Sequence, residues 1–192
     1  GAGASTHLMV RDEGTALEHP LLFFKKRRKK SMPYRCAVWG GYMYSWRITK
    51  YNPEIRDEHG YYGKDEWIMM RDIGKDINGE ILSIDEYLRV EDLYIGAVLE
   101  FQKCNNIDKF TASDVGRFRF RNQKIKPSKN MKKLYKKVKE NDIIGASDLL
   151  DIIRLNLRAL LNCNLLYEDD MFVHFGWEYY MYIGSKQKWD KA

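Results

Sequence analysis

The segment from residue 117 to residue 139 carries the strongest chemical signal in the sequence. It contains eleven Lys and Arg residues and no Asp or Glu. Neighbouring like charges on a helix repel one another by a few tenths of a kcal/mol, and a bound polyanion removes that repulsion while its own counterions are released. The segment therefore predicts a non-enzymatic nucleic-acid-binding patch, with RNA as the expected ligand. The cations expected to bind are Arg117, Arg119, Arg121, Lys124, Lys126, Lys132, Lys133, Lys136 and Lys137.

Aromatic rings alternate with cations at the start of this segment. Phe118 and Phe120 separate three arginines, so one face of a strand there would present rings beside guanidinium groups. Bases of single-stranded nucleic acid stack on such rings. No sequence signature of a common nucleic-acid-binding fold accompanies the pattern. The alternative is a lysine-rich surface that acids elsewhere in the chain balance, namely Asp148, Asp151, Glu168, Asp169 and Asp170.

Two histidines are the weak candidates for catalysis. His59 lies in a polar stretch beside Asp57 and Glu58, and His174 lies among aromatic residues. Imidazole titrates near neutral pH, so such a pair could act as acid and base in a small ribonuclease. The ordinary interpretation is an exposed turn residue at 59 and a packed strand residue at 174. Because no catalytic motif is present, we predict no catalytic residue, no metal and no cofactor.

Aromatic residues suggest a second class of function. They form 14% of the chain and cluster near residues 34–46 and 177–182. If those strands are half exposed, their rings would mark a protein-interaction surface, as in an immunity, antidefence or regulatory factor. If three helices cover the sheet on both faces, the same rings belong to the core. We favour this second interpretation.

The composition bounds the class of protein. The chain has 192 residues, of which 44% are hydrophobic and 31% are charged, values typical of one globular domain. No apolar run approaches the ~20 residues of a membrane helix. Cys36, Cys104 and Cys163 are odd in number and far apart, which predicts free thiols of a reducing compartment. We therefore expect a cytoplasmic protein that has no membrane partner.

The first 31 residues differ in character from the rest of the chain. They hold seven Lys and Arg residues against three acids, and six of the cations form an unbroken run over residues 25–30. A run of this kind can bind nucleic acid or act as a nuclear localisation signal, yet the segment shows no hydrophobic periodicity. We predict a disordered basic leader or a vector-derived segment over residues 1–31, followed by a single domain over residues 32–192.

The periodicity of apolar residues predicts the elements that position these groups. A capping box at Ser83 and Glu86 begins the first helix, Ser128 begins a second, and Ser147 begins a third. The predicted helices cover residues 83–103, 128–138 and 147–161. The predicted strands, bounded by turns such as Asn52-Pro53, are 42–50, 67–70, 110–112, 118–120 and a hairpin over 171–184.

The order of these elements indicates the fold class. Strands precede and follow the helices without βαβ alternation, which favours a single α+β domain with a mainly antiparallel sheet and about three helices. The first and last strands are expected to be neighbours. Within the last run, Met171, Val173 and Phe175 should share one face, and Phe172 and His174 the other.

Two motifs near the ends of the predicted domain carry a family resemblance. Residues 44–53 read YSWRITKYNP, and residues 174–184 read HFGWEYYMYIG. They resemble the motifs of a family of small uncharacterised bacterial cytoplasmic proteins that begin near WRITKYNP and close with HFGWxYYMYIG. The resemblance covers about residues 43–185. It implies a native start near Met32 or Met43 and brings no activity with it.

Overall fold

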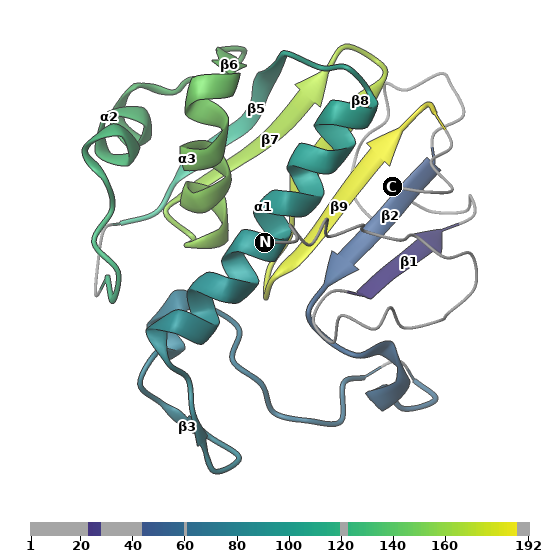
Figure 1. The fold of residues 1–192 in the computed structure, drawn as a ribbon, viewed down its shortest axis with the longest axis vertical. Coiled ribbons are helices and arrows are strands. Elements are labelled where there is room, and N and C mark those ends of the chain that lie inside the picture. Colours follow the sequence, from purple (N-terminus) through teal and green to yellow (C-terminus); the bar gives the residue numbers. More distant parts are fainter. Residues whose placement is uncertain (1–22, 28–43, 60, 120–122, 188–192) are drawn as a thin grey trace, which may run out of the picture.

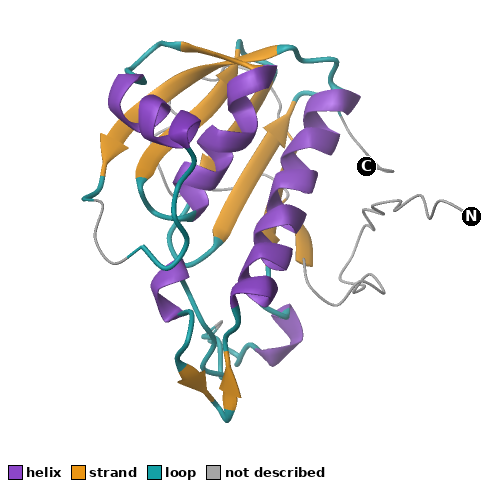
Figure 2. Cartoon of the chain, turned by 60° about the vertical axis from the view of Figure 1, so that its left-hand side comes forward, coloured by secondary structure: helices purple, strands orange, loops and turns teal. Residues whose placement is uncertain are grey.

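The computed structural model of the chain describes residues 23–27, 44–59, 61–119 and 123–187. Within these residues a seven-stranded sheet has the order β1-β2-β9-β8-β7-β5-β6, and every neighbouring pair is antiparallel. Helices α1 and α3 cross in front of the sheet, and α2 packs beside α3 (Figures 1 and 2). The prediction of an α+β fold with a mainly antiparallel sheet is confirmed.

The elements have the following bounds. The strands of the large sheet are β1 Phe23–Arg27, β2 Tyr44–Thr49, β5 Lys109–Arg117, β6 Ile143–Gly145, β7 Leu161–Tyr167, β8 Met171–Phe175 and β9 Tyr180–Ser185. A small hairpin joins β3 Asp76–Ile77 to β4 Glu80–Ile81. The helices are α1 Ile84–Cys104, α2 Lys129–Lys137 and α3 Ala146–Leu157. Two 3-10 turns are η1 Pro53–Ile55 and η2 Met70–Asp72.

Helix α1 forms where its cap and its apolar spacing predict it. The Ser83 hydroxyl accepts a hydrogen bond from the Glu86 amide at 3.0 Å, which satisfies one of the unpaired N–H groups of the first turn. Acids lie in the first turn and Lys103 in the last, as the helix dipole favours. The buried side of α1 carries mainly large apolar and aromatic residues, among them Tyr87, Tyr94, Val98 and Phe101.

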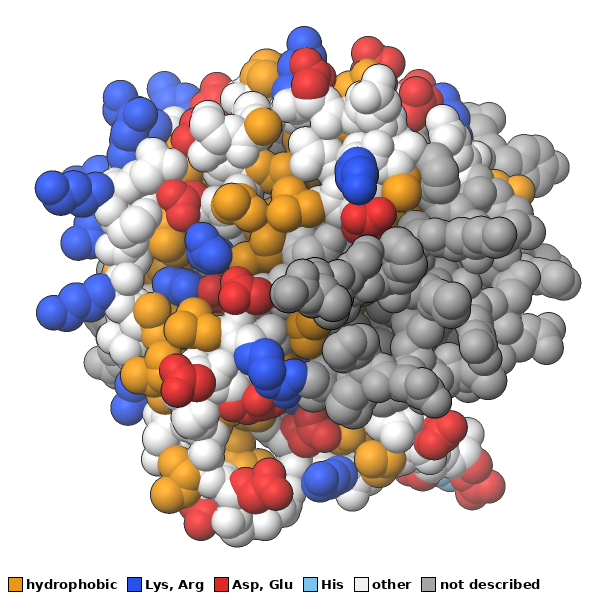
Figure 3. Space-filling view, in the orientation of Figure 1, with side chains coloured by type: hydrophobic (Ala, Val, Ile, Leu, Met, Phe, Trp, Pro, Cys, Tyr) orange, Lys and Arg blue, Asp and Glu red, His pale blue; other side chains and the backbone are white. Residues whose placement is uncertain are grey.

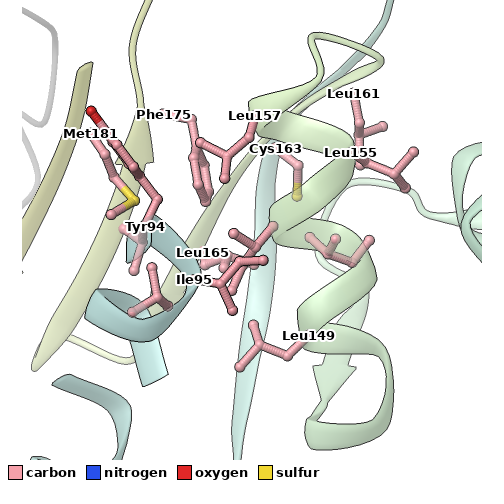
Figure 4. Close-up of a cluster of buried hydrophobic side chains, with 14 of the residues drawn as sticks. Tyr94, Ile95, Leu149, Leu155, Leu157, Leu161, Cys163, Leu165, Phe175 and Met181 are labelled. Carbon is pink, nitrogen blue, oxygen red and sulfur yellow. The ribbon is translucent and has the colours of Figure 1, made fainter. Parts of the chain in front are cut away.

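The core lies between the helices and one face of the sheet. Ile95 of α1 and Leu149 and Leu155 of α3 pack toward Cys163 and Leu165 of β7 (Figure 4). The strands alternate as expected: Met171, Val173 and Phe175 belong to this core, whereas His174 is half-buried on the opposite face. Because α1 and α3 cover the same face, the interpretation that the three helices cover both faces is wrong.

Strand β9 lies beside both β2 and β8. Ile48 of β2 pairs with Met181, and His174 of β8 pairs with Tyr182. The predicted contact between the first and last strands is therefore confirmed for β2 and β9. The predicted hairpin over 171–184 is also confirmed.

The third helix begins and ends earlier than its apolar stripe predicts. Its N-cap is Gly145 and not Ser147. It ends at Leu157, because Ala159 takes a left-handed backbone conformation (φ 51°) and the Asn156 side chain accepts a hydrogen bond from the Cys163 amide at 2.8 Å. The residues from Leu161 onward then turn back and form β7, a strand that the periodicity did not predict.

The predictions of three short strands are also corrected. Residues 67–70 form no strand, because the Asp72 carboxylate accepts hydrogen bonds from the Ile68 and Met69 amides and begins the turn η2. The strand expected at 110–112 extends over the whole of β5. The separate strand predicted over 118–120 is wrong for its described residues, because Phe118 and Arg119 lie beyond the end of β5 and belong to no strand. Phe120 lies outside the described residues.

The N-terminal segment contributes the edge strand β1. Phe23 pairs with Thr49 and Arg27 pairs with Ser45, both antiparallel. The expectation of a disordered leader is therefore wrong for residues 23–27, because the free edge of β2 offers backbone partners to any extended segment. The remainder of residues 1–31, including the last three cations of the basic run, lies outside the described residues, as do the termini of the predicted domain, 32–43 and 188–192.

Candidate nucleic-acid interface

Helix α2 separates its apolar residues from its cations. Ser128 caps the helix as predicted, its hydroxyl accepting a hydrogen bond from the Met131 amide at 3.0 Å. Met131 and Leu134 are buried on one side, and Val138 continues that side just after the helix. These side chains hold α2 against the rest of the domain, so the opposite side faces solvent.

The solvent side of α2 consists of lysines. We call Lys129, Lys132, Lys133, Lys136 and Lys137 the lysine face of α2; all five are exposed. Lys124, Lys126 and Lys139, which flank the helix, are exposed as well. Figure 3 shows Lys and Arg side chains projecting from the edge of the molecule where α2 lies in Figure 1. In the part of the chain that the structure describes, none of these lysines forms an ion pair.

The carboxylates near α2 bind neutral groups. Asp148 and Asp151 of α3 accept hydrogen bonds from the Asn130 side chain at 3.1 and 2.9 Å. Glu140 accepts from the backbone amides of Asp114 and Val115 at 3.2 and 3.0 Å. Among the described residues, the expected acidic balance thus reaches only the Asn130 side of the helix. Of the other acids expected to supply it, Asp170 pairs with Lys186 at 2.8 Å.

Arg117 has a different position from the one predicted. Its guanidinium donates hydrogen bonds to the backbone carbonyls of Tyr135 and Val138. Carbonyls at a helix C-terminus lack partners within the helix, and a cation there also interacts favourably with the helix dipole. Arg117 therefore anchors the end of α2 to β5, and we no longer count it among the ligand-binding cations. Arg119 is exposed, and Arg121 lies outside the described residues.

An exposed aromatic pair lies next to this anchor. Phe118 is 39% exposed, and its ring packs edge-to-face with that of Trp177, with the ring centroids 5.9 Å apart and the planes at 67°. Trp177 is 74% exposed and lies in the turn between β8 and β9. In the sequence, Trp177 belongs to an aromatic cluster that is distant from the basic patch, so the spacing of residues does not link the two. The available signal was the position of Trp177 directly after Gly176, a residue type that is typical of turns.

Two of the other aromatic residues that suggested an interaction surface, Trp46 and Tyr179, are core residues, whereas Tyr44, Tyr180 and Tyr182 are half-buried. Trp46 is buried against Phe101 at 4.9 Å between ring centroids. Tyr179 is buried among Tyr87, Tyr94 and Trp67. Three members of the aromatic cluster near residues 34–46, namely Tyr34, Trp39 and Tyr42, lie outside the described residues.

The two candidate histidines lie on different elements of the structure. His59 is exposed in the turn after η1, with Nε2 3.6 Å from a Glu58 oxygen. His174 is half-buried in β8, with its ring 6.0 Å from that of Tyr182. A shared acid–base site needs both groups within hydrogen-bonding reach of one substrate. Neither histidine therefore joins the candidate interface.

Burial of His174 has a measurable consequence. Desolvation lowers the pKa of its imidazole, and the charge of Asp114 opposes the effect. The unfolded chain then binds more protons than the folded chain at pH values just below about 6.5. We expect the free energy of unfolding to fall as the pH is lowered through this range. His174→Gln should flatten the pH dependence of the free energy of unfolding, which denaturant titrations at several pH values measure. An unchanged pH dependence would contradict this explanation.

The described residues contain no group of three or more His, Cys, Asp or Glu side chains placed to hold a metal ion. None of the helices in the same residues combines the length and the apolar character that crossing a bilayer requires. Comparisons with known protein families, with curated proteins and with solved structures find no match.

Proposed function

We propose that this protein binds nucleic acid, without catalysis, through the lysine face of α2. The observation that carries the proposal is the arrangement of that helix: every residue of the lysine face is exposed, and none is paired with a carboxylate of the described chain. A structural surface of this length normally mixes charges, because i,i+4 pairs of opposite sign stabilise a helix and like pairs destabilise it.

Phosphates supply the negative charges that the lysine face lacks. Each phosphate bound by a lysine releases condensed counterions, and this release favours binding independently of base sequence. The helix also presents its lysines from a fixed base, since Ser128 caps its start and Arg117 holds its end. We therefore expect affinity for RNA and DNA with little dependence on sequence.

The test is a salt series with fluorescent oligonucleotides of random sequence. The logarithm of the association constant should fall linearly with the logarithm of the salt concentration, by about 0.7 per phosphate contacted on a single strand. Four contacts correspond to a loss of affinity of about 50-fold between ~50 and ~200 mM salt. Absence of binding at ~50 mM salt would overturn the proposal. A salt-insensitive complex with a protein would then favour the protein-interaction alternative.

A further inference from the structure

We propose that the preferred ligand is single-stranded, with phosphates on one flank of α2 and a base stacked on the Trp177–Phe118 pair. This inference rests on the proposed function and narrows its ligand class. The pair is suited to stacking because Trp177 contacts Phe118 at an angle and is otherwise largely open to solvent. A base stacked on an aromatic ring gains affinity whatever its identity, since every base has a π-face.

The aromatic pair and α2 are held at the same end of the sheet. The Tyr135 hydroxyl donates a hydrogen bond to the Phe118 carbonyl at 2.8 Å. The Phe118 amide donates to the Leu160 carbonyl at 3.0 Å, just before β7 begins. Strand β7 in turn separates β5 from β8, the strand that leads to Trp177. Trp177, Phe118 and Tyr135 therefore form a continuous path from the β8–β9 turn to α2.

The geometry of α2 indicates which lysines lie on this path. Successive residues of an α-helix are rotated by about 100°, so Lys132 and Lys136 lie on the Tyr135 flank. Lys133 and Lys137 lie on the opposite flank with Asn130.

The two flanks differ in their electrostatic surroundings. Asn130 contacts Asp148 and Asp151, whose charges repel phosphate on that side. The flank that leads to the aromatic pair has no such carboxylate contact among the described residues. A bound strand therefore follows Lys132 and Lys136 toward Phe118.

A base must leave the duplex stack before it can reach Trp177. In a duplex, each base face is covered by its neighbours, and unstacking costs a few kcal/mol. A single strand does not bear this cost in full, so contacts with the aromatic pair add to the affinity that the lysines provide. The affinity for a duplex comes only from the lysines.

The first test compares a single-stranded oligonucleotide of about 12 nucleotides with the duplex of the same length. Trp177→Ala should weaken single-strand binding by about 5- to 150-fold, the range expected for one stacked base, and should leave duplex binding unchanged. Trp177→Phe should restore part of the loss. Binding of the single strand should also quench indole fluorescence in the wild type and not in the Phe variant.

A matched pair of charge variants tests the path. Lys132→Glu with Lys136→Glu should weaken single-strand binding more than Lys133→Glu with Lys137→Glu, although both variants change the net charge equally. Equal losses in the two double variants, or no effect of Trp177→Ala, would overturn the inference while leaving lysine-face binding intact. A wild type that binds neither oligonucleotide would overturn the proposed function itself.

Discussion

Replacing Lys132, Lys133 and Lys136 with Glu should abolish detectable binding to RNA and DNA at near-physiological salt. Each replacement removes one cation of the lysine face and adds one repulsive charge, so the loss multiplies across the three sites. The fold should survive, because all three side chains are exposed and lie off the buried side formed by Met131 and Leu134. Fluorescence anisotropy with random-sequence oligonucleotides measures the loss.

The matched control is a triple Glu variant at exposed lysines away from α2. Lys64, Lys103 and Lys109 are suitable, since all are exposed and none forms an ion pair among the described residues. This variant has the same net charge as the α2 variant, so long-range electrostatics change equally. It should retain most of the affinity. If both variants lose affinity to the same extent, overall charge and not the lysine face determines binding.

Arg158→Met should produce the largest loss of stability of any single substitution proposed here. Arg158 follows α3 and makes two hydrogen bonds of 2.7 Å to the Glu91 carboxylate of α1. The side chain of Glu91 is 0% exposed and that of Arg158 is 5% exposed. Removing the guanidinium leaves a buried carboxylate short of partners, which costs about 3–5 kcal/mol. The melting temperature should fall by about 10 °C.

Two further variants separate the effect of an unpaired Glu91 carboxylate from a simple loss of packing. Arg154→Met removes a partner that is 33% exposed and 3.6 Å from Glu91, so it should cost much less than Arg158→Met. The double variant Glu91→Leu, Arg158→Met removes both buried charges and should recover part of the lost stability, because it leaves no unpaired charge. If Arg158→Met is no more destabilising than Arg154→Met, the buried pair does not join α1 to α3 as described.

The parts of the fold that follow from local sequence are α1, α2 and the β8–β9 hairpin. In each, the cap or the apolar spacing is contained within the segment itself, as with Ser83 for α1 and Ser128 for α2. Strand β7 could not be predicted in this way. Leu157, Leu160 and Leu161 continue the apolar stripe of α3, whereas the helix ends because Ala159 has a positive φ and Asn156 bonds to Cys163. These contacts exist only after the strand has folded back.

The candidate site likewise has one part that the local sequence predicts and other parts that depend on tertiary contacts. The lysine face follows from helical spacing around Met131 and Leu134, so the sequence predicts it. The anchoring of α2 by Arg117 depends on β5 lying beside the end of that helix. The contact between Phe118 and Trp177 depends on strands distant in sequence. Sequence reasoning can therefore find the cations but cannot say which of them serve the fold.

Lysine footprinting tests the central claim most directly. The protein is acetylated at limiting reagent, with and without a saturating single-stranded oligonucleotide, and the modification of each lysine is measured by mass spectrometry. Binding through α2 predicts strong protection of Lys132 and Lys136, and weaker protection of Lys133 and Lys137. Lys64, Lys103 and Lys109 should react equally in both samples. Bound oligonucleotide with no protection of the α2 lysines, or with equal protection at all exposed lysines, would contradict the proposed interface.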